Sequence, residues 1–340
     1  MTPRVSIIIP CRDHGDYIER ALRSCDAQTH PNKELIVVDD GSVDGSEEVI
    51  RSVQRDISTP LKIISGSGTG PGAARNLGLD ESTGHYIQWL DADDLIEPQK
   101  IEQQLKVLEK SEADIAYGPW KTRRYQRDFV HYYEDQNGQY YPDVLEALIK
   151  GNWFAVHATL CTRSMTQEIL WDEELPVLED ADYWLRAAAA GMRFEYTGMG
   201  DQAIYCRYGI PSRNEMSRDW LRTRLEINRK PLSLLDSERH RHSIAMGFLG
   251  TSEAAYTGRQ FDIARTAMSE AVEMVSNEEL RVLTRERVGS FGSLGGMGLA
   301  LVSVFRGIRA SARTAVMNLF GMDENLSLKE NLGKRTSGST

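Results

Sequence analysis

The sequence predicts an α/β fold in which a mostly parallel sheet is flanked by helices. Short β-branched runs alternate with segments whose apolar residues recur at helical spacing. Runs such as Arg4–Pro10 and Glu34–Val38 are apolar almost throughout, as strands are when helices cover both faces of a parallel sheet. This alternation favours parallel strands joined by right-handed crossovers.

The N-terminal part of the chain supplies these elements in regular order. Pro31 follows the first helix and Pro71 begins the third, because proline fits the first helical turn but not the interior of a helix. In chain order we expect a strand over 4–10, a helix from Asp16 to His30, a strand over 34–38, a helix containing Val49 and Val53, a strand over 61–64, a helix over 71–79 and a strand over 86–90.

The rest of the chain is less regular. We expect a strand over 114–118, a hairpin or loop over 121–133, a strand over 155–160, a helix after Glu179 and late strands at 195–196 and 203–207. From Asp219 helix formers dominate, and small residues between Ala254 and Ala271 are spaced like a helix hairpin. The sequence therefore predicts a catalytic domain over residues 1–218 and a helical region over residues 219–340.

Composition narrows the function. The formal net charge of −10 argues against a nucleic-acid partner, which requires clustered Lys and Arg. The four cysteines have no metal-ligand spacing and fit a reducing compartment, where we expect them to be packing residues. No secretory signal is visible after Met1, so we expect a cytoplasmic protein.

A predicted amphipathic helix lies near the C-terminus. Residues 294–320 contain an apolar run too short to span a bilayer, and arginines lie beside its apolar face. Such a helix could lie on the anionic inner face of a membrane as a peripheral anchor. It could equally pack on the catalytic domain or on another subunit of a homo-oligomer.

The strand over 86–90 leads directly into three acids, Asp91, Asp93 and Asp94. Open α/β sheets bind ligands beyond the carboxyl ends of their strands. Two carboxylates one residue apart can hold Mg²⁺ or Mn²⁺, with coordination positions left for a diphosphate. A solvated acidic turn that caps the next helix would explain the same residues.

A glycine-rich segment over residues 66–72 precedes Arg75. It is not a dinucleotide fingerprint, because it follows the third strand and Pro71 occupies the third glycine position. Its backbone could pass close to a ligand and present Arg75 from a helix start. A flexible loop with a solvated Arg75 is the alternative.

Five blocks of this chain stand in a characteristic order, at residues 5–10, 34–46, 72–78, 84–94 and 178–186. In their spacing as well as their residues, these blocks resemble glycosyltransferase family 2. The resemblance implies a GT-A fold, an inverting transfer from a nucleotide sugar, and a glycan or lipid-linked acceptor in cell-surface polysaccharide synthesis.

The resemblance also assigns residues to the donor. Asp40 would contact the nucleobase, expected to be uracil, and Asp91 and Asp93 would be the D-x-D pair that holds Mg²⁺ or Mn²⁺. The first block departs from the family, with Arg12 and Asp13 in place of an aromatic residue and an asparagine. The residues assigned to donor binding are Pro10, Asp13, Asp40, Arg75 and Asp91.

Three acids, Glu179, Asp180 and Asp182, open the predicted helix after residue 178. One acid could cap this helix and Asp182 could pair with Arg186, but three acids exceed what capping requires. The resemblance identifies Asp180 as the general base that accepts the acceptor proton.

Several residues are candidates for the acceptor side or the leaving group. For the aromatic ones a packing role is the simpler interpretation, and we expect His157 to be a strand histidine with a backbone partner. The candidates are Trp120, Trp153, Phe154 and His157 for the acceptor, and Arg207 or Arg213 for the diphosphate.

Two other functions fit parts of the sequence. A sugar nucleotidyltransferase shares the gross fold, but residues 10–13 lack the glycine-rich loop ending in arginine that such an enzyme needs. A nucleotide-sugar-binding protein without catalysis would not require acids at 40, 91, 93 and 180 together.

Overall fold

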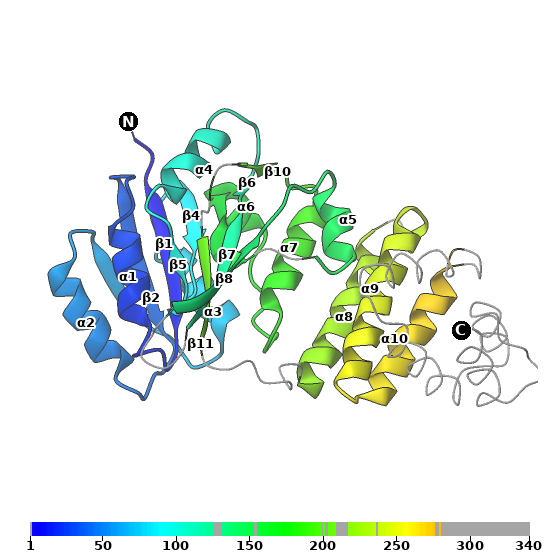
Figure 1. The fold of residues 1–340 in the computed structure, drawn as a ribbon. Coiled ribbons are helices and arrows are strands. Elements are labelled where there is room, and N and C mark those ends of the chain that lie inside the picture. The colour runs from blue at the N-terminus through cyan, green and yellow to red at the C-terminus, as the bar shows by residue number, and fades with distance from the viewer. Residues whose placement is uncertain are drawn as a thin grey trace, which may run out of the picture. The chain divides into compact units, whose positions relative to one another are not determined.

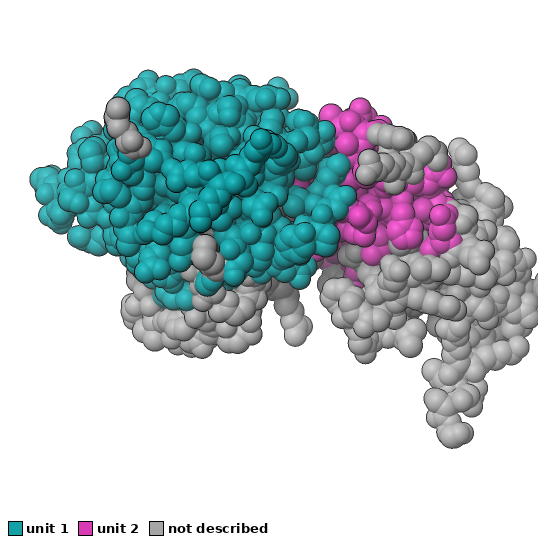
Figure 2. Space-filling view, turned by 90° about the horizontal axis from the view of Figure 1, so that it is seen from above, with its two compact units in different colours: residues 1–145, 153–212 teal, residues 146–152, 213–340 magenta. Residues whose placement is uncertain are grey.

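The computed structural model describes residues 2–125, 131–152, 155–198, 200, 203–208, 217–235, 237–275 and 279. The chain divides into two compact units, residues 1–145 with 153–212 and residues 146–152 with 213–340 (Figure 2). All of the residues assigned to the donor, the metal and the general base lie in the first unit. The domain boundary predicted after residue 218 stays a proposal.

A sheet forms the centre of the first unit (Figure 1). It has seven strands in the order β10-β6-β9-β4-β1-β2-β3. β9 runs antiparallel to β4 and β6, and the other neighbouring strands pair in parallel. The predicted α/β class is therefore confirmed. The strands are β1 (Val5–Cys11), β2 (Lys33–Asp39), β3 (Leu61–Ser65), β4 (Tyr86–Trp89), β6 (Ile115–Tyr117), β9 (Thr159–Thr162) and β10 (Phe194–Tyr196).

Helices flank this sheet, and one of them packs against it unusually closely. In α3, Gly78 faces β1, where a Cβ atom at position 78 would lie 2.4 Å from Cγ2 of Ile8. Glycine is therefore needed for this approach, which fixes α3 against the strands. The helices of the unit are α1 (Ile18–Asp26), α2 (Ser46–Asp56), α3 (Pro71–Asp80), α4 (Lys100–Leu108), α6 (Arg163–Glu168) and α7 (Glu179–Ala189).

The strand register places several loops at one edge of the sheet. Cys11 at the end of β1 pairs with Asp39 at the end of β2, and Asp39 pairs with Ser65 at the end of β3. The loops that follow these three parallel strands therefore leave the sheet side by side. The acids after β4 leave from the same edge, because β4 pairs in parallel with β1.

A second, four-stranded sheet has the order β5-β11-β7-β8. The hairpin predicted over residues 121–133 corresponds to the antiparallel pair β7 and β8, although residues 126–130 lie outside the described residues. The late strand predicted at 203–207 is β11, which pairs in parallel with β7. The strands are β5 (Leu95–Ile96), β7 (Trp120–Tyr125), β8 (His131–Asn137) and β11 (Ala203–Tyr208).

The strand predicted over residues 155–160 begins too early. Residues Val156–Ala158 form a 3₁₀ helix, and the strand starts only at Thr159. The hydroxyl of Thr159 donates to the carbonyl of Val156 at 2.8 Å, which closes the turn before the strand. His157 therefore lies in this turn and not in a strand.

The second unit is helical in its described part. The predicted small-residue hairpin corresponds to α9 and α10, where Ala255, Ala264, Ala267 and Ala271 are buried. The predicted amphipathic helix over 294–320 lies outside the described residues. Within the described ranges, none of the helices has both the length and the apolar character needed to cross a bilayer. The helices are α5 (Val144–Ile149), α8 (Arg218–Leu234), α9 (Ser237–Thr257) and α10 (Phe261–Met274), with α5 divided between the units.

Candidate active site

A buried arginine joins the two acidic motifs of the first unit. Arg75 in α3 donates from Nη2 to Oδ1 of Asp91 at 2.6 Å and from Nη1 to Oε1 of Glu179 at 2.9 Å. Its side chain is 2% exposed, and its guanidinium lies 4.2 Å from the ring centre of Trp171. One cation therefore links the end of β4 to the first turn of α7.

Arg75 is thus not the solvated side chain of a flexible loop. Burial alone would lower the pKa of Arg75, but the carboxylates of Asp91 and Glu179 outweigh burial and raise it. Burial likewise opposes ionisation of Asp91, yet the adjacent guanidinium lowers the pKa of Asp91 overall. The ion pairs therefore keep both Arg75 and Asp91 charged, and a donor contact by either residue stays a proposal.

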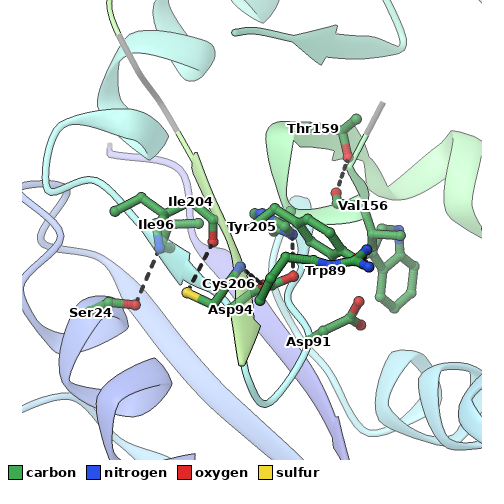
Figure 3. A network of polar contacts seen from close by, with 12 residues as sticks. Ser24, Trp89, Asp91, Asp94, Ile96, Val156, Thr159, Ile204, Tyr205 and Cys206 are labelled. Carbon is green, nitrogen blue, oxygen red and sulfur yellow. Dashed lines mark hydrogen bonds and ion pairs between the residues drawn. The ribbon is translucent and has the colours of Figure 1, made fainter. Parts of the chain in front are cut away.

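The three acids after β4 have different surroundings. Asp94 is 1% exposed, and its Oδ1 accepts a hydrogen bond from the backbone N–H of Cys206 at 2.6 Å (Figure 3). Its Oδ2 lies 3.0 Å from Nδ1 of His157. Asp91 is held by Arg75. Asp93 is half-buried, and burial together with the carboxylates of Asp94 and Asp91 raises the pKa of Asp93 to about 8. A cation beside Asp93 would relieve this repulsion between like charges.

The donor set suits a metal that is shared with a substrate. Among the described residues, no group of three or more His, Cys, Asp or Glu side chains could by itself hold a metal ion. Mg²⁺ commonly takes only one or two protein carboxylates and fills its remaining positions with water and phosphate oxygens. Asp93, together with Asp91, fits such an open site.

The glycine-rich loop folds over Asp40. The two carboxylate oxygens of Asp40 accept hydrogen bonds from the backbone N–H groups of Gly68 and Gly70, each at 2.8 Å. Gly66 lies so close that a Cβ atom there would be 2.5 Å from Oδ1 of Asp40. Asp40 therefore organises the loop beyond β3, and its contact with a nucleobase stays a proposal.

Further hydrogen bonds connect the loops after β1, β2 and β3. Asp13 has a left-handed backbone (φ 54°), and its Oδ1 accepts a hydrogen bond from the N–H of Val43 at 2.8 Å. Arg12 donates from Nη1 to the carbonyl of Gly68 at 3.2 Å. Pro10, the penultimate residue of β1, pairs with Val38 of β2. The predicted donor residues Pro10, Asp13 and Asp40 therefore lie at one edge of the sheet.

Asp180 lies in the first turn of α7, next to the anchored Glu179. Burial and the neighbouring Glu179 carboxylate raise the pKa of Asp180 to about 7. The N-cap position is Leu178, with a left-handed backbone and no side-chain capping bond, so capping does not account for the acids that follow. Asp182 accepts from Nε of Arg186 at 2.7 Å, which confirms the predicted pair. A carboxyl group with a near-neutral pKa suits general base catalysis.

The candidates for the acceptor side and the leaving group have different outcomes in the structure. His157 is 1% exposed, so its ring is closed off from an acceptor, and its prediction as a strand residue with a backbone partner is wrong because its ring faces Asp94. Trp120 is buried as a packing residue. Arg207 lies in β11 with its guanidinium over the ring of Tyr205. Trp153, Phe154 and Arg213 lie outside the described residues.

Sequence reasoning missed two partners of Arg75. The sequence groups Glu179 with the other acids of its helix and gives no sign that it pairs with Arg75. Nothing in the sequence indicates that Trp171 lies against the guanidinium of Arg75. Trp171 also stacks on Tyr183 of α7, with ring centres 4.0 Å apart and ring planes at 4°. The helix that carries Asp180 is therefore anchored through both an ion pair and an aromatic stack.

Comparison with known proteins points to one family. The model of glycosyl transferase family 2 matches residues 6–171, just under half of the chain. The predicted resemblance to glycosyltransferase family 2 is therefore confirmed over these residues. An uncharacterized glycosyltransferase of Rickettsia conorii is 31% identical over 195 residues, which cover 55% of this chain and 30% of that protein. One from Haemophilus influenzae is 36% identical over 116 residues, covering 34% of this chain and 46% of that protein. The chain thus spans less than half the length of these two relatives.

The fold also resembles solved structures. The S. aureus TarS 1–349 structure in complex with UDP-GlcNAc has a TM-score of 0.60 and 17% identity, over 82% of this chain and 83% of that chain. A second structure of S. aureus TarS 1–349 has a TM-score of 0.57 and 18% identity, over 82% of this chain and 83% of that chain. At this level of identity the likeness concerns the fold alone, and it confirms the predicted GT-A fold.

Replacing Arg75 by methionine should strongly destabilise the protein, because Asp91 and Glu179 would lose their shared cation. Removing one partner of a buried ion pair typically costs about 3–5 kcal/mol. Urea unfolding followed by circular dichroism measures this change. The matched control is Arg51→Met, which breaks an exposed pair with Glu47 and should cost at most about 0.5 kcal/mol. Equal costs for both variants would contradict the buried bridge.

Proposed function

We propose that this chain is a glycosyltransferase that moves a sugar from a nucleotide diphosphate to a hydroxyl of a glycan or lipid-linked acceptor. The observation that carries the proposal is the Arg75 bridge, which brings the acids after β4 and the acids of α7 to one site. The match to the glycosyl transferase family 2 model and the fold likeness to a UDP-GlcNAc-bound protein support a nucleotide-sugar donor, and we propose a UDP-sugar.

On the donor side, each residue has a distinct part in the proposal. The loops that carry Pro10, Asp13 and Asp40 would bind the nucleoside, with Asp40 next to the base. Asp91, fixed by Arg75, would lie near the ribose, and Asp93 with Asp91 would hold Mg²⁺ or Mn²⁺. The cation would neutralise charge on the departing diphosphate. Arg75 itself would act by holding Asp91, because its guanidinium already has two carboxylate partners.

On the acceptor side, Asp180 would take the proton from the attacking hydroxyl. An inverting displacement needs this base on the face of the sugar opposite the leaving diphosphate. Glu179 is held by Arg75, whereas the hydrogen bond found at the Asp180 carboxyl comes from the adjacent N–H of Ala181. Asp180 is therefore the better placed of the two acids to exchange a proton with a substrate.

The cellular setting is also proposed. We place the reaction on the cytoplasmic side of the membrane, in the synthesis of a cell-surface polysaccharide. Residues 294–320 would provide either a peripheral membrane contact or a contact between subunits. A nucleotide-sugar-binding protein without catalysis is the competing function, and release of sugar from UDP-sugars in the presence of Mg²⁺ or Mn²⁺ would exclude it.

UDP binding should depend on a divalent cation held by Asp93. Calorimetry with UDP and Mn²⁺ should show an affinity that falls at least about tenfold, or roughly 1.4 kcal/mol, in EDTA or in Asp93→Ala. The control is Asp56→Ala, which removes an exposed acid at the end of α2 and should leave UDP affinity unchanged. Full affinity in both EDTA and Asp93→Ala would overturn the metal assignment.

Asp180→Asn should lower turnover by about 10²–10⁴-fold and leave UDP affinity unchanged, because a positioned general base contributes that much to the rate. The wild-type rate should rise with pH through about 7, since only the ionised form of Asp180 accepts a proton and its pKa is about 7. In Asp180→Asn, the rate should no longer rise with pH through this range. Near-normal turnover with an unchanged pH profile would move the base to Glu179 or Asp182.

A further inference from the structure

Four tyrosines gather near the end of the sheet that carries the candidate site. Tyr117 ends β6 and Tyr196 ends β10, while Tyr140 and Tyr141 follow β8. The ring centres of Tyr117 and Tyr196 are 5.2 Å apart, those of Tyr117 and Tyr141 are 6.4 Å apart, and those of Tyr140 and Tyr196 are 6.1 Å apart. These four residues form one aromatic cluster, hereafter the tyrosine cluster.

The tyrosine cluster has a buried member, Tyr117, and an exposed member, Tyr140. Tyr117 is 1% exposed, and its hydroxyl accepts a hydrogen bond from the backbone N–H of Tyr141 at 3.0 Å. Gly138 has a φ of +78° and lies on Trp120, where a Cβ atom would be 2.6 Å from Cε3. The segment that bears Tyr140 is therefore held at both ends. Tyr140 nevertheless remains 63% exposed, so burial does not explain an aromatic ring at this position.

The strand register places the cluster close to the site. Ile87 of β4 and Ile115 of β6 both pair with Cys161 of β9. Tyr117 therefore lies level with Trp89, two residues before Asp91. At a strand spacing of about 4.8 Å, β6 and β10 lie roughly 10 and 14 Å from β4. The proposed donor loops follow β1, β2 and β3, on the opposite side of β4.

The chemistry of the cluster suits an uncharged ring. A tyrosine has a flat apolar face and a polar hydroxyl at its rim, and it loses little conformational entropy when it binds a ligand. Glu195 points to the other face of β10 from Tyr196, because side chains alternate along a strand. Sugar rings have the matching character, with apolar C–H faces and hydroxyls around the edge.

We propose that the tyrosine cluster binds the acceptor glycan, with Tyr140 and Tyr196 stacking on neutral sugar rings beyond the reacting hydroxyl. This inference rests on the proposed glycosyltransferase function and adds the chemical class of the acceptor. An acceptor bound here would extend away from the donor along β6 and β10. The proposal favours an uncharged oligosaccharide over a phosphate-rich polymer, for which these tyrosines offer no cation.

The test measures binding of neutral chito-, cello- and malto-oligosaccharides to the full chain by calorimetry, with UDP and Mn²⁺ binding measured separately. Tyr140→Ala should weaken binding of the preferred oligosaccharide roughly tenfold. Tyr140→Phe keeps the ring and should bind within about twofold of wild type, whereas Tyr140→Leu, which is apolar but not flat, should resemble Tyr140→Ala. Phe261→Ala, which removes an exposed aromatic ring of the second unit, is the control and should change nothing.

The outcomes separate this proposal from the proposed function. Wild-type affinity in Tyr140→Ala and Tyr140→Leu would overturn the stacking role, as would a wild-type chain that binds UDP but none of the oligosaccharides. If the wild-type chain does not bind UDP, the result would instead count against the proposed donor site. Melting temperatures close to wild type for the Tyr140 variants, as expected for an exposed side chain, exclude unfolding as the cause of weaker binding.

Discussion

The buried guanidinium of Arg75 is the interaction on which the candidate site depends. A cation removed from water is stable only if well-placed carboxylates offset its lost hydration. Here Asp91 and Glu179 do so, at positions 16 and 104 residues away in the sequence. The close approach of α3 at Gly78 and the ring of Trp171 help to position the arginine. Folding of α3, β4 and α7 is therefore coupled to assembly of the site.

This bridge also gives the acids within each motif different environments. In each motif Arg75 fixes one acid, Asp91 after β4 and Glu179 in α7, and a nearby acid keeps a raised pKa. The pKa is about 8 for Asp93 and about 7 for Asp180. One arginine cannot neutralise all four carboxylates. In the proposed transfer, a cation beside Asp93 would offset the repulsion between these carboxylates, and Asp180 would accept a proton from the acceptor.

Most of the first unit could be predicted because its strands are buried on both faces. Such strands give apolar runs in the sequence, and the first polar residue after each run marks the end of the strand. The acids after β2 and β4 could be placed at the ligand-binding edge for the same reason. Contacts between distant positions could not be predicted in this way. The ring of His157 faces Asp94, and the carboxylate of Asp40 holds backbone N–H groups 28 and 30 residues later. Local periodicity carries no information about such partners.

The most direct test of the bridge is a double-mutant cycle of Arg75→Met and Glu179→Gln on the free energy of unfolding. Because either substitution alone breaks the same contact, we predict that the double variant is more stable than the summed single costs imply, by about 1–3 kcal/mol. Costs that add within about 0.5 kcal/mol would show that the two side chains act independently. Such additivity would contradict the coupling of α3 to α7 through Arg75.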